Sequence, residues 1–536
     1  MTCGELLARL LDRLGVRVVF GIPGVHTVEL YRGLPATRIR HITPRHEQGA
    51  GFMADGYARV TGRPGVCFVI TGPGMTNIMT ALGQAYADSV PMLVISSVNK
   101  TGQLGMGSGR LHELPSQRNL AAGVTAFSHT LMRPDELPAL LARAFAVFGG
   151  MRPRPVHIEI PIDVITADAD HVETKLGSIP SRPAPDPVAI SRAVDVLERA
   201  QRPVVLLGGG AADSGADAVE LVERLDAPTA CTFNAKGVLP RRHPLTVGSN
   251  AGLAPVRDLL SRADAVLAIG TELGETDYDV YFDGNLRIPG RLIRVDIDAE
   301  QLNRNFLADI AILSDARLAI RALADELRSR QPPRSRVPGV ESAAATRAQL
   351  EAQWPDAWKS HRRILDTLQA ALPEAIVVGD STQLVYSGNH LFESNAPRSW
   401  FSSATGYGSL GYGLPAAIGA KLAAPHRPVV ALVGDGGIQF TIAELASAVE
   451  AETPIIVLLW NNRGYGEIKR YMQSHGLPLI GVDIYTPDFQ ALAKGFGCGC
   501  ARASSFEHLH RLLEDAAHAP RPTVIEVMED AEFLIS

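Results

Sequence analysis

An acidic residue and a pair of amide residues follow two hydrophobic runs in the last third of the chain. Asp435 lies in Gly434-Asp435-Gly436, directly after the run Val429–Val433. Asn461-Asn462 follows after 24 intervening residues and closes the next run, Ile455–Leu459. If both runs are strands of one parallel sheet, Asp435 and Asn462 lie side by side at its carboxyl edge, where open α/β sheets bind ligands.

These residue types suit a divalent cation that carries a diphosphate. Asp435 offers a carboxylate oxygen, Asn462 a side-chain carbonyl oxygen and Gly464 a backbone carbonyl. Mg²⁺ takes about six oxygens and completes its shell from phosphate and water. Gly436 and Gly437 allow the backbone to approach a phosphate closely beside a helix N-terminus. For Gly-Asp-Gly alone, a capped strand–turn–helix would be the better interpretation, but the Asn pair argues against it.

Three stretches of the chain alternate short β-rich runs with helical patterns, which is typical of parallel α/β domains. We expect domains over residues 1–170, 190–330 and 360–536, joined by Pro-rich connectors at 179–187 and 331–335. The predicted fold class is therefore α/β, with three doubly wound parallel sheets. Strands are expected at Val16–Phe20, Val66–Ile70, Met92–Ser96, Val156–Ile160, Val204–Leu207, Val266–Ile269, Leu292–Val295, Ile376–Val378, Val429–Val433, Ile455–Leu459 and Thr523–Val527.

Composition excludes several classes of function. The chain has 536 residues, 46% of them hydrophobic, and a net charge of −6, which argues against a nucleic-acid surface. No uncharged apolar run approaches the roughly 20 residues that span a bilayer, and the start lacks a signal-peptide pattern. Five scattered cysteines indicate a reduced protein, so we expect a cytoplasmic location without membrane attachment. Cys498-Gly499-Cys500 has two interpretations, a metal site or ordinary packing, and we favour packing.

A glutamate far upstream, Glu47, begins a helical segment rich in small residues. As a lone residue it would be a solvated helix N-terminal acid. Its setting, Arg45 to Gly51, closely resembles the activating-glutamate segment of thiamine-diphosphate enzymes, as do the flanking motifs at 20–24 and 71–77. Together with Gly-Asp-Gly and Asn-Asn, these motifs resemble the acetolactate synthase and 2-oxo acid decarboxylase family over essentially the whole chain. The resemblance implies thiamine diphosphate, Mg²⁺, and pyrimidine-binding, central Rossmann-like and diphosphate-binding domains.

The resemblance also implies roles for individual residues. Glu47 would hydrogen-bond to N1′ of the aminopyrimidine and promote its imino tautomer, which takes the C2 proton. Leu410 would hold the cofactor bent, and the backbone at Gly406 and Gly408 would contact the aminopyrimidine. In this family the activating glutamate and the metal motif come from different subunits, which implies a homodimer or a dimer of dimers. Further cofactor contacts are implied at Thr382, Gln383, Gly434, Gly436, Gly437 and Tyr465, and metal ligands at Asp435, Asn462 and Gly464.

The middle stretch carries Gly208-Gly209-Gly210 after a predicted strand, which looks like a phosphate-binding turn. Acetolactate synthases hold FAD in the corresponding domain and carry an arginine after the strand equivalent to Val266–Ile269. Here the segment Gly270–Asp277 has no arginine and two glutamates, a poor surface for an anionic dinucleotide. We therefore expect no FAD, and the alternative is a functional dinucleotide site.

Residues for proton delivery and substrate binding are less sharply specified. The first stretch has no adjacent His-His pair, so His26 and His112 are the candidates for proton delivery. The stretches at residues 20–27, 29–35 and 85–90 resemble bacterial 5-guanidino-2-oxopentanoate decarboxylases. This resemblance implies a guanidinium substrate, which Glu113 or Glu467 could bind. Glu467 is also a catalytic candidate, because pyruvate-decarboxylase-type enzymes carry a catalytic acid one residue further on. The alternative for Glu467 is a surface ion pair with the nearby Lys469-Arg470.

The expected reaction is decarboxylation of a 2-oxo acid through a C2 ylide and an enamine, whose protonation releases an aldehyde. One alternative is attack of the enamine on a second 2-oxo acid, as in acetolactate synthases. An alternative of another class is a non-catalytic nucleotide-binding regulatory protein. Intact Glu47, Asp435 and Asn462 argue against that last alternative.

Overall fold

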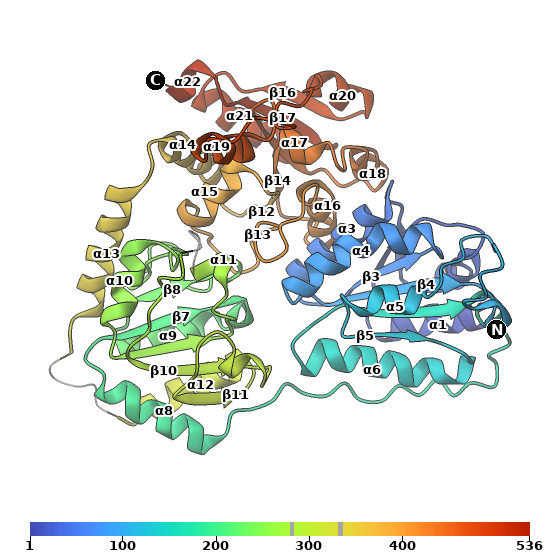
Figure 1. Ribbon diagram of the computed structural model, residues 1–536, viewed down its shortest axis with the longest axis horizontal. Helices are drawn as coiled ribbons and strands as arrows, with labels where there is room; N and C mark the ends of the chain where they lie inside the picture. Colours follow the sequence, from blue (N-terminus) through green and yellow to red (C-terminus); the bar gives the residue numbers. More distant parts are fainter. Residues whose placement is uncertain (279–282, 331–335, 536) are drawn as a thin grey trace. The chain divides into compact units, whose positions relative to one another are not determined.

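The computed structural model describes residues 1–278, 283–330 and 336–535, so the expected connector at 331–335 lies outside the described residues. The described chain forms two compact units. The first comprises Met1–Pro180, Ala375–Val385 and Ser402–Ser536, and the second Ser181–Glu374 and Tyr386–Phe401. Three α/β sheets of six, five and six strands confirm the predicted fold class (Figure 1). The domain boundaries at 170, 190, 330 and 360 stay predictions.

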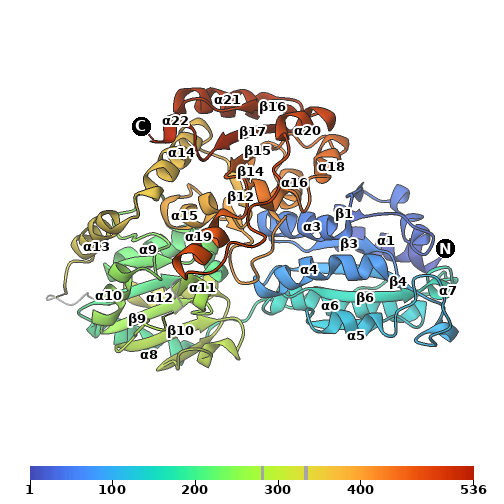
Figure 2. The same ribbon diagram turned by 45° about the horizontal axis from the view of Figure 1, so that its top comes forward.

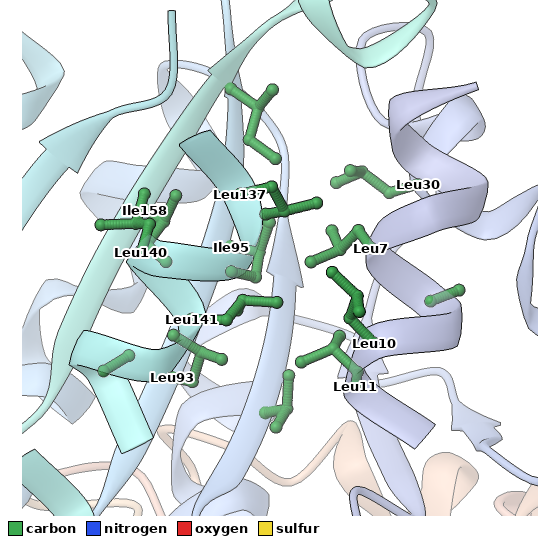
Figure 3. Close-up of a cluster of buried hydrophobic side chains, with 14 of the residues drawn as sticks. Leu7, Leu10, Leu11, Leu30, Leu93, Ile95, Leu137, Leu140, Leu141 and Ile158 are labelled. Carbon is green, nitrogen blue, oxygen red and sulfur yellow. The ribbon is translucent and has the colours of Figure 1, made fainter. Parts of the chain in front are cut away.

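The first sheet has the strand order β2-β1-β3-β4-β6-β5, and its paired strands are parallel. Leucines of α1 (Cys3–Arg13) and α6 (Leu137–Gly150) meet over Leu93 and Ile95 of β4 (Figure 3). Helix α3 (Glu47–Thr61) and helix α4 (Pro73–Ala87) pack together and against the same sheet. Its strands are β1 (Val18–Gly21), β2 (Arg40–Ile42), β3 (Gly65–Val69), β4 (Met92–Val98), β5 (Phe127–Thr130) and β6 (Val156–Pro161).

The second sheet has the order β11-β10-β9-β7-β8 and hydrophobic cores on both faces. Val205 enters the core that contains α8, α9 and α12, while the adjacent Val204 enters the core that contains α10 and α13. This alternation is what a doubly covered parallel sheet requires. Its elements are α8 (Pro187–Arg199), β7 (Pro203–Leu207), α9 (Gly215–Leu225), β8 (Thr229–Cys231), α10 (Ala254–Arg262), β9 (Ala265–Ile269), β10 (Arg291–Asp296), β11 (Ile310–Leu313), α12 (Ala316–Arg328) and α13 (Gly339–Gln353).

The third sheet has the order β13-β12-β14-β15-β17-β16. Its central strands are buried along their whole length, as expected for continuous hydrophobic runs. Its elements are α14 (Ala357–Ala371), β12 (Ile376–Gly379), α15 (Gln383–Leu391), β13 (Trp400–Ser402), α16 (Gly413–Ala423), β14 (Val429–Gly434), α17 (Asp435–Ile438), α18 (Glu444–Glu450), β15 (Ile456–Asn461), α19 (Gly466–Ser474), α20 (Phe489–Gly495), β16 (Gly499–Arg502), α21 (Phe506–His518), β17 (Thr523–Met528) and α22 (Glu532–Ile535).

Helices α3 and α16 lie side by side and pack closely through two glycines (Figures 1 and 2). A Cβ on Gly56 would lie 2.0 Å from the carbonyl oxygen of Ala416. A Cβ on Gly419 would lie 1.9 Å from the carbonyl oxygen of Met53. Any larger residue would therefore push the two helix backbones apart.

A buried ionic network lies beside this contact. The guanidinium of Arg59 on α3 lies 2.6 Å from both Asp55 and Asp88. The hydroxyl of Tyr412 donates a hydrogen bond to Asp55, and Thr405 donates one to Asp88. The helix that begins at Glu47 is thereby fixed to the loop that precedes α16.

All eleven expected strands are present, and each end lies within two residues of its expected position. Six further strands, β2, β5, β8, β11, β13 and β16, were not expected. Within the described ranges, no helix is both long and apolar enough to cross a membrane.

Candidate active site

The expected metal ligands come together at the carboxyl edge of the third sheet. Strands β14 and β15 pair in parallel with Gly434 opposite Trp460, so the residues after them are neighbours. The backbone N–H of Asn462 donates to Asp435 Oδ1 at 3.2 Å, and Thr486 Oγ1 donates to Asp435 Oδ2 at 3.4 Å. Burial raises the pKa of Asp435, and the Asn462 N–H opposes that rise.

The backbone beyond Asn462 brings a third oxygen to the same turn. Gly464 has a φ of +155°, and a Cβ there would lie 2.4 Å from the carbonyl oxygen of Val482. A Cβ on Gly436 would lie 2.8 Å from the Tyr465 ring and 3.4 Å from the Gly464 carbonyl oxygen. Glycine at both positions therefore lets the backbone at 464–465 pack closely against the turn at 435–436, and the Gly464 N–H donates a hydrogen bond to Asp435. This oxygen set has the chemistry that a hard cation requires.

Thr382 and Gln383 close this end of the site from strand β12. A Cβ on Gly434 would lie 2.7 Å from Thr382 Oγ1. Gln383 Oε1 accepts a hydrogen bond from Asn462 Nδ2 at 3.0 Å. Because the Asn462 nitrogen is the donor in this bond, Gln383 fixes the orientation of the Asn462 amide. Hydrogen-bond partners commonly orient metal-binding side chains in this way.

The loop expected to contact the aminopyrimidine is held by Asp380. The two carboxylate oxygens of Asp380 accept hydrogen bonds from Gly411 N and Gly413 N, each at 3.2 Å. Burial raises the pKa of Asp380 to about 6, and these backbone donors oppose the shift. Gly406 and Gly408 have φ values of +76° and +77° and are exposed, while Leu410 is half-buried. The backbone of this loop at Gly406 and Gly408 is therefore accessible to a ligand.

Glu47 is the first residue of α3 and follows strand β2. Its side chain is nearly buried, with a relative exposure of 8%. Asn77 Nδ2 donates to Glu47 Oε2 at 2.9 Å. A Cβ on Gly74 would lie 3.1 Å from Glu47 Oε1, so a glycine there gives the carboxylate room.

Glu444 was not expected from the sequence. Its carboxylate accepts hydrogen bonds from the backbone N–H groups of Arg45 and His46, at 3.0 and 3.1 Å, immediately before Glu47. Burial raises the pKa of Glu444. The partners lie 399 and 398 residues apart in the chain, and no sequence pattern relates such distant positions.

The two candidate histidines lie together although their loops are far apart in sequence. The rings of His26 and His112 have centroids 5.2 Å apart in an edge-to-face arrangement. Nδ1 of each ring is buried and has no hydrogen-bond partner in the described structure. Burial, and then the neighbouring His112, lower the pKa of His26. Gly72 makes the approach possible, because a Cβ there would lie 2.6 Å from the His112 carbonyl oxygen.

The two acids considered for substrate binding have different surroundings. The Glu113 carboxylate accepts hydrogen bonds from the backbone N–H groups of residues 107, 108 and 110, which lower its pKa, and so it holds its own loop. Glu467 is exposed and accepts a bond from Gln383 Nε2 at 3.4 Å. Lys469 pairs with Asp483, and the guanidinium of Arg470 lies 2.6 Å from Glu529.

The glycine turn at 208–210 in the second unit packs against neighbouring backbone. The N–H groups of Gly208 and Gly210 donate to the carbonyl oxygens of Ile269 and Gly270, at 2.8 and 3.1 Å. These donors are therefore engaged within the domain. Cys500 lies on the edge strand β16 and Cys498 immediately precedes that strand, and burial raises the pKa of Cys498 to about 11.

The candidate residues share one topological position, because each follows the carboxyl end of a strand. Three family models match the chain: "Thiamine pyrophosphate enzyme, N-terminal TPP binding domain" at residues 1–120, its "central domain" at 190–323 and its "C-terminal TPP binding domain" at 380–527. The chain belongs to the thiamine pyrophosphate enzyme family.

Known relatives align with this chain over nearly its whole length. It is 48% identical over 530 residues to "Probable 2-ketoarginine decarboxylase AruI" of Pseudomonas aeruginosa, covering 98% of this chain and 94% of that protein. It is 32% identical over 550 residues to the acetolactate synthase isozyme 1 large subunit of Escherichia coli, covering 99% and 94%. A Mycobacterium smegmatis structure described as a thiamin diphosphate-dependent enzyme aligns with a TM-score of 0.84 and 25% identity, over 98% and 99% of the two chains.

Proposed function

We propose that this thiamine pyrophosphate enzyme decarboxylates a 2-oxo acid, with 2-ketoarginine (5-guanidino-2-oxopentanoate) as its favoured substrate. The observation that supports this substrate is the 48% identity to the Pseudomonas protein, against 32% to the acetolactate synthase subunit. The neighbouring positions of Asp435, Asn462 and Gly464 support a metal-bound diphosphate. Bound thiamine diphosphate supplies the electron sink for loss of CO2.

In this proposal the two ends of the cofactor are held by different sheets. Asp435, Asn462 and the Gly464 carbonyl would hold Mg²⁺, and we expect no FAD in the central domain. Glu47 would hold a proton at N1′ of the aminopyrimidine, while the backbone of the 406–408 loop and Leu410 would position the rings. The diphosphate would be held by Thr382, Gln383, Gly434, Gly436, Gly437 and Tyr465.

We assign proton delivery to the product carbon to His26 and His112. Their edge-to-face contact places two imidazoles within one small volume, where one ring can accept a proton while the other donates. The lowered pKa of His26 favours the neutral form of that ring. A neutral ring beside a second imidazole suits transfer of a proton between them.

The assembly we propose is a homodimer or a dimer of dimers in the cytoplasm. Glu47 and Asp435 follow strands of different sheets, and the family arrangement joins them across subunits. The segment at 466–485 leaves Tyr471, Ile480 and Tyr485 exposed by 58%, 74% and 85%. Large apolar side chains gathered on one segment favour burial against a partner, here a second copy of this chain.

A substrate panel tests the proposed reaction. The purified protein with thiamine diphosphate and Mg²⁺ is given 2-ketoarginine, pyruvate and 2-oxohexanoate, and CO2, aldehyde and acyloin products are measured separately. We expect CO2 and aldehyde in equal amounts, fastest from 2-ketoarginine. Acetolactate from pyruvate as the main product would favour carboligation instead, and absence of CO2 from every acid would contradict the proposal.

Glu467 is the proposed guanidinium partner, because Glu113 is occupied by its own loop. Glu467→Gln should lower kcat/KM for 2-ketoarginine by about 10- to 100-fold relative to 2-oxohexanoate, the loss expected for a charge-assisted hydrogen bond. Glu514→Gln, at an exposed position on α21, is the matched control. An unchanged ratio between the two substrates would remove Glu467 from substrate recognition.

A further inference from the structure

A hollow in the second unit is lined by many more cations than acids. It lies between the segment after β8, helix α13 and residues 390–394, and it encloses about 830 Å³ including its open mouth. The glycine turn at 208–210 is not among the described residues that line it. The charged lining residues are Lys236, Arg241, Arg242, Arg347 and Arg362, with Glu351 and Glu393 as the acids.

Two hydrogen-bond donors in this lining are buried without a partner in the described structure. They are Nε of Arg241 and Nε1 of Trp354. Both groups can only donate, so a neighbouring donor cannot satisfy them. Leaving a buried donor unsatisfied is unfavourable, which makes an acceptor atom in the hollow the missing partner.

Two other cations are oriented but keep their charge. Arg347 Nη1 donates to the carbonyl oxygens of Pro244 and Thr246, at 2.9 and 2.6 Å. Lys236 Nζ donates to the carbonyl oxygens of Gly388 and Phe392, and burial lowers its pKa to about 8. Backbone carbonyls fix the direction of a cation without neutralising it, so the hollow keeps a positive potential.

The two acids of the lining offset only part of the charge of the five cations. Glu393 Oε2 lies 3.8 Å from Arg241 Nε, which is too long for a hydrogen bond. Glu351 is exposed to solvent, where its charge is screened. Arg362 pairs with Asp366, with its Nε 2.9 Å from Oδ2, and lies over the face of Trp354 with its guanidinium carbon 5.6 Å from the ring centroid.

We propose that this hollow binds a small anion, whose carboxylate or phosphate oxygens accept hydrogen bonds from Arg241 and Trp354. The site is separate from the residues that hold thiamine diphosphate, because those residues belong to the first unit. The arginine side chains that line the hollow each offer paired N–H donors, which suit planar or tetrahedral oxyanions. The proposal does not depend on which 2-oxo acid the enzyme uses.

Calorimetry of the loaded enzyme tests this site. Saturating thiamine diphosphate and Mg²⁺ occupy the diphosphate site, and inorganic phosphate or acetate is then titrated in a low-salt buffer. We expect saturable binding of at least one anion. Tighter phosphate binding would indicate a phosphoryl ligand, and tighter acetate binding a carboxylate.

Three variants locate the binding. Trp354→Phe keeps the ring and removes the N–H, and Arg241→Gln removes the charge and the fork. Each should weaken binding by about 10-fold or more. Arg317→Gln, on an exposed residue of α12, should leave binding unchanged. If Arg241→Gln does not fold, Trp354→Phe decides. No saturable binding to the wild-type enzyme, or undiminished binding in Trp354→Phe, would overturn the proposal.

Discussion

The carboxylate of Glu47 is oriented by its neighbours within the first sheet domain. Asn77 donates to one oxygen, and the missing Cβ of Gly74 leaves room at the other. A side chain that is fixed before its partner arrives loses little conformational freedom on binding. Its geometry therefore suits a group that must meet a ring nitrogen with a defined direction.

Glu47→Gln should reduce kcat for CO2 release by about 10²- to 10⁴-fold, the range for loss of a general acid–base group. Glutamine keeps the size and can still accept from Asn77, but it cannot share a proton with the cofactor ring. Steady-state CO2 release is the measurement. Glu29→Gln, at a surface ion pair of the same domain, is the matched control. Full activity of Glu47→Gln would remove its assigned role.

His26→Asn and His112→Asn should separate the two halves of the reaction. Asparagine tolerates the φ of +61° at residue 112, so the loop is retained. We expect CO2 release in the first turnover to persist while aldehyde formation slows by about 100-fold. Rapid-quench measurement of both products checks this, with the exposed His171→Asn as control. Equal slowing of both products would contradict a role confined to proton delivery.

Residue types and strand ends were enough to place Asp435 beside Asn462 and to single out His26 and His112 separately. The contact between the two histidines was not predictable, because it depends on how two loops pack. Thr486 and Glu444 were missed for the same reason, since each acts through a tertiary contact with a distant residue.

Among the elements, α3 and α16 show a contact in which local preference and packing oppose each other. Alanine is favoured over glycine inside a helix by about 1 kcal/mol. At Gly419, however, a Cβ would lie 1.9 Å from a backbone oxygen that cannot rotate away. Packing therefore decides against alanine at this position.

Gly419→Ala should lower the free energy of unfolding by about 1–3 kcal/mol, the usual cost of overpacking. Gly495→Ala is the matched control, because a Cβ at this helical glycine would meet nothing within 4 Å. The control should be neutral or stabilising by up to about 1 kcal/mol. Urea denaturation of both variants tests the contrast, and equal effects would contradict the packing argument.

The strands missed from the sequence are those at the edges of the three sheets. Each sheet has one missed strand at each end of its order, for example β2 and β5 in the first sheet. Interior strands of a parallel sheet are buried on both faces and read as continuous apolar runs. Edge strands are short or half-exposed, as in β11 and β16, so they lack this signal.

At the scale of the whole molecule, buried neutral histidines make stability depend on pH. His157 is fully buried between Ser96 and Ser128, and burial lowers its pKa to about 3. In the unfolded chain its pKa returns to about 6.5. Below that pH the unfolded state binds a proton that the folded state does not, so stability falls as pH falls from about 6.5 towards 3.

His157→Gln should flatten this dependence. Each such imidazole contributes a slope of about 1 kcal/mol per pH unit. Urea denaturation between pH 5 and 7.5 should therefore show a shallower acid slope in the variant than in wild type. The exposed His171→Gln should keep the wild-type slope. An unchanged slope in His157→Gln would show that other groups govern the acid limit.

The contact between Glu444 and the backbone before Glu47 has a consequence for the order of synthesis. Residue 444 leaves the ribosome long after Arg45, its partner 399 residues earlier. At about 5–20 residues per second, this interval lasts roughly 20–80 s. During that time the first sheet can form, but the backbone N–H groups of Arg45 and His46 before α3 lack the carboxylate of Glu444. The end of the first domain that carries Glu47 is therefore completed only when the last third of the chain has been made.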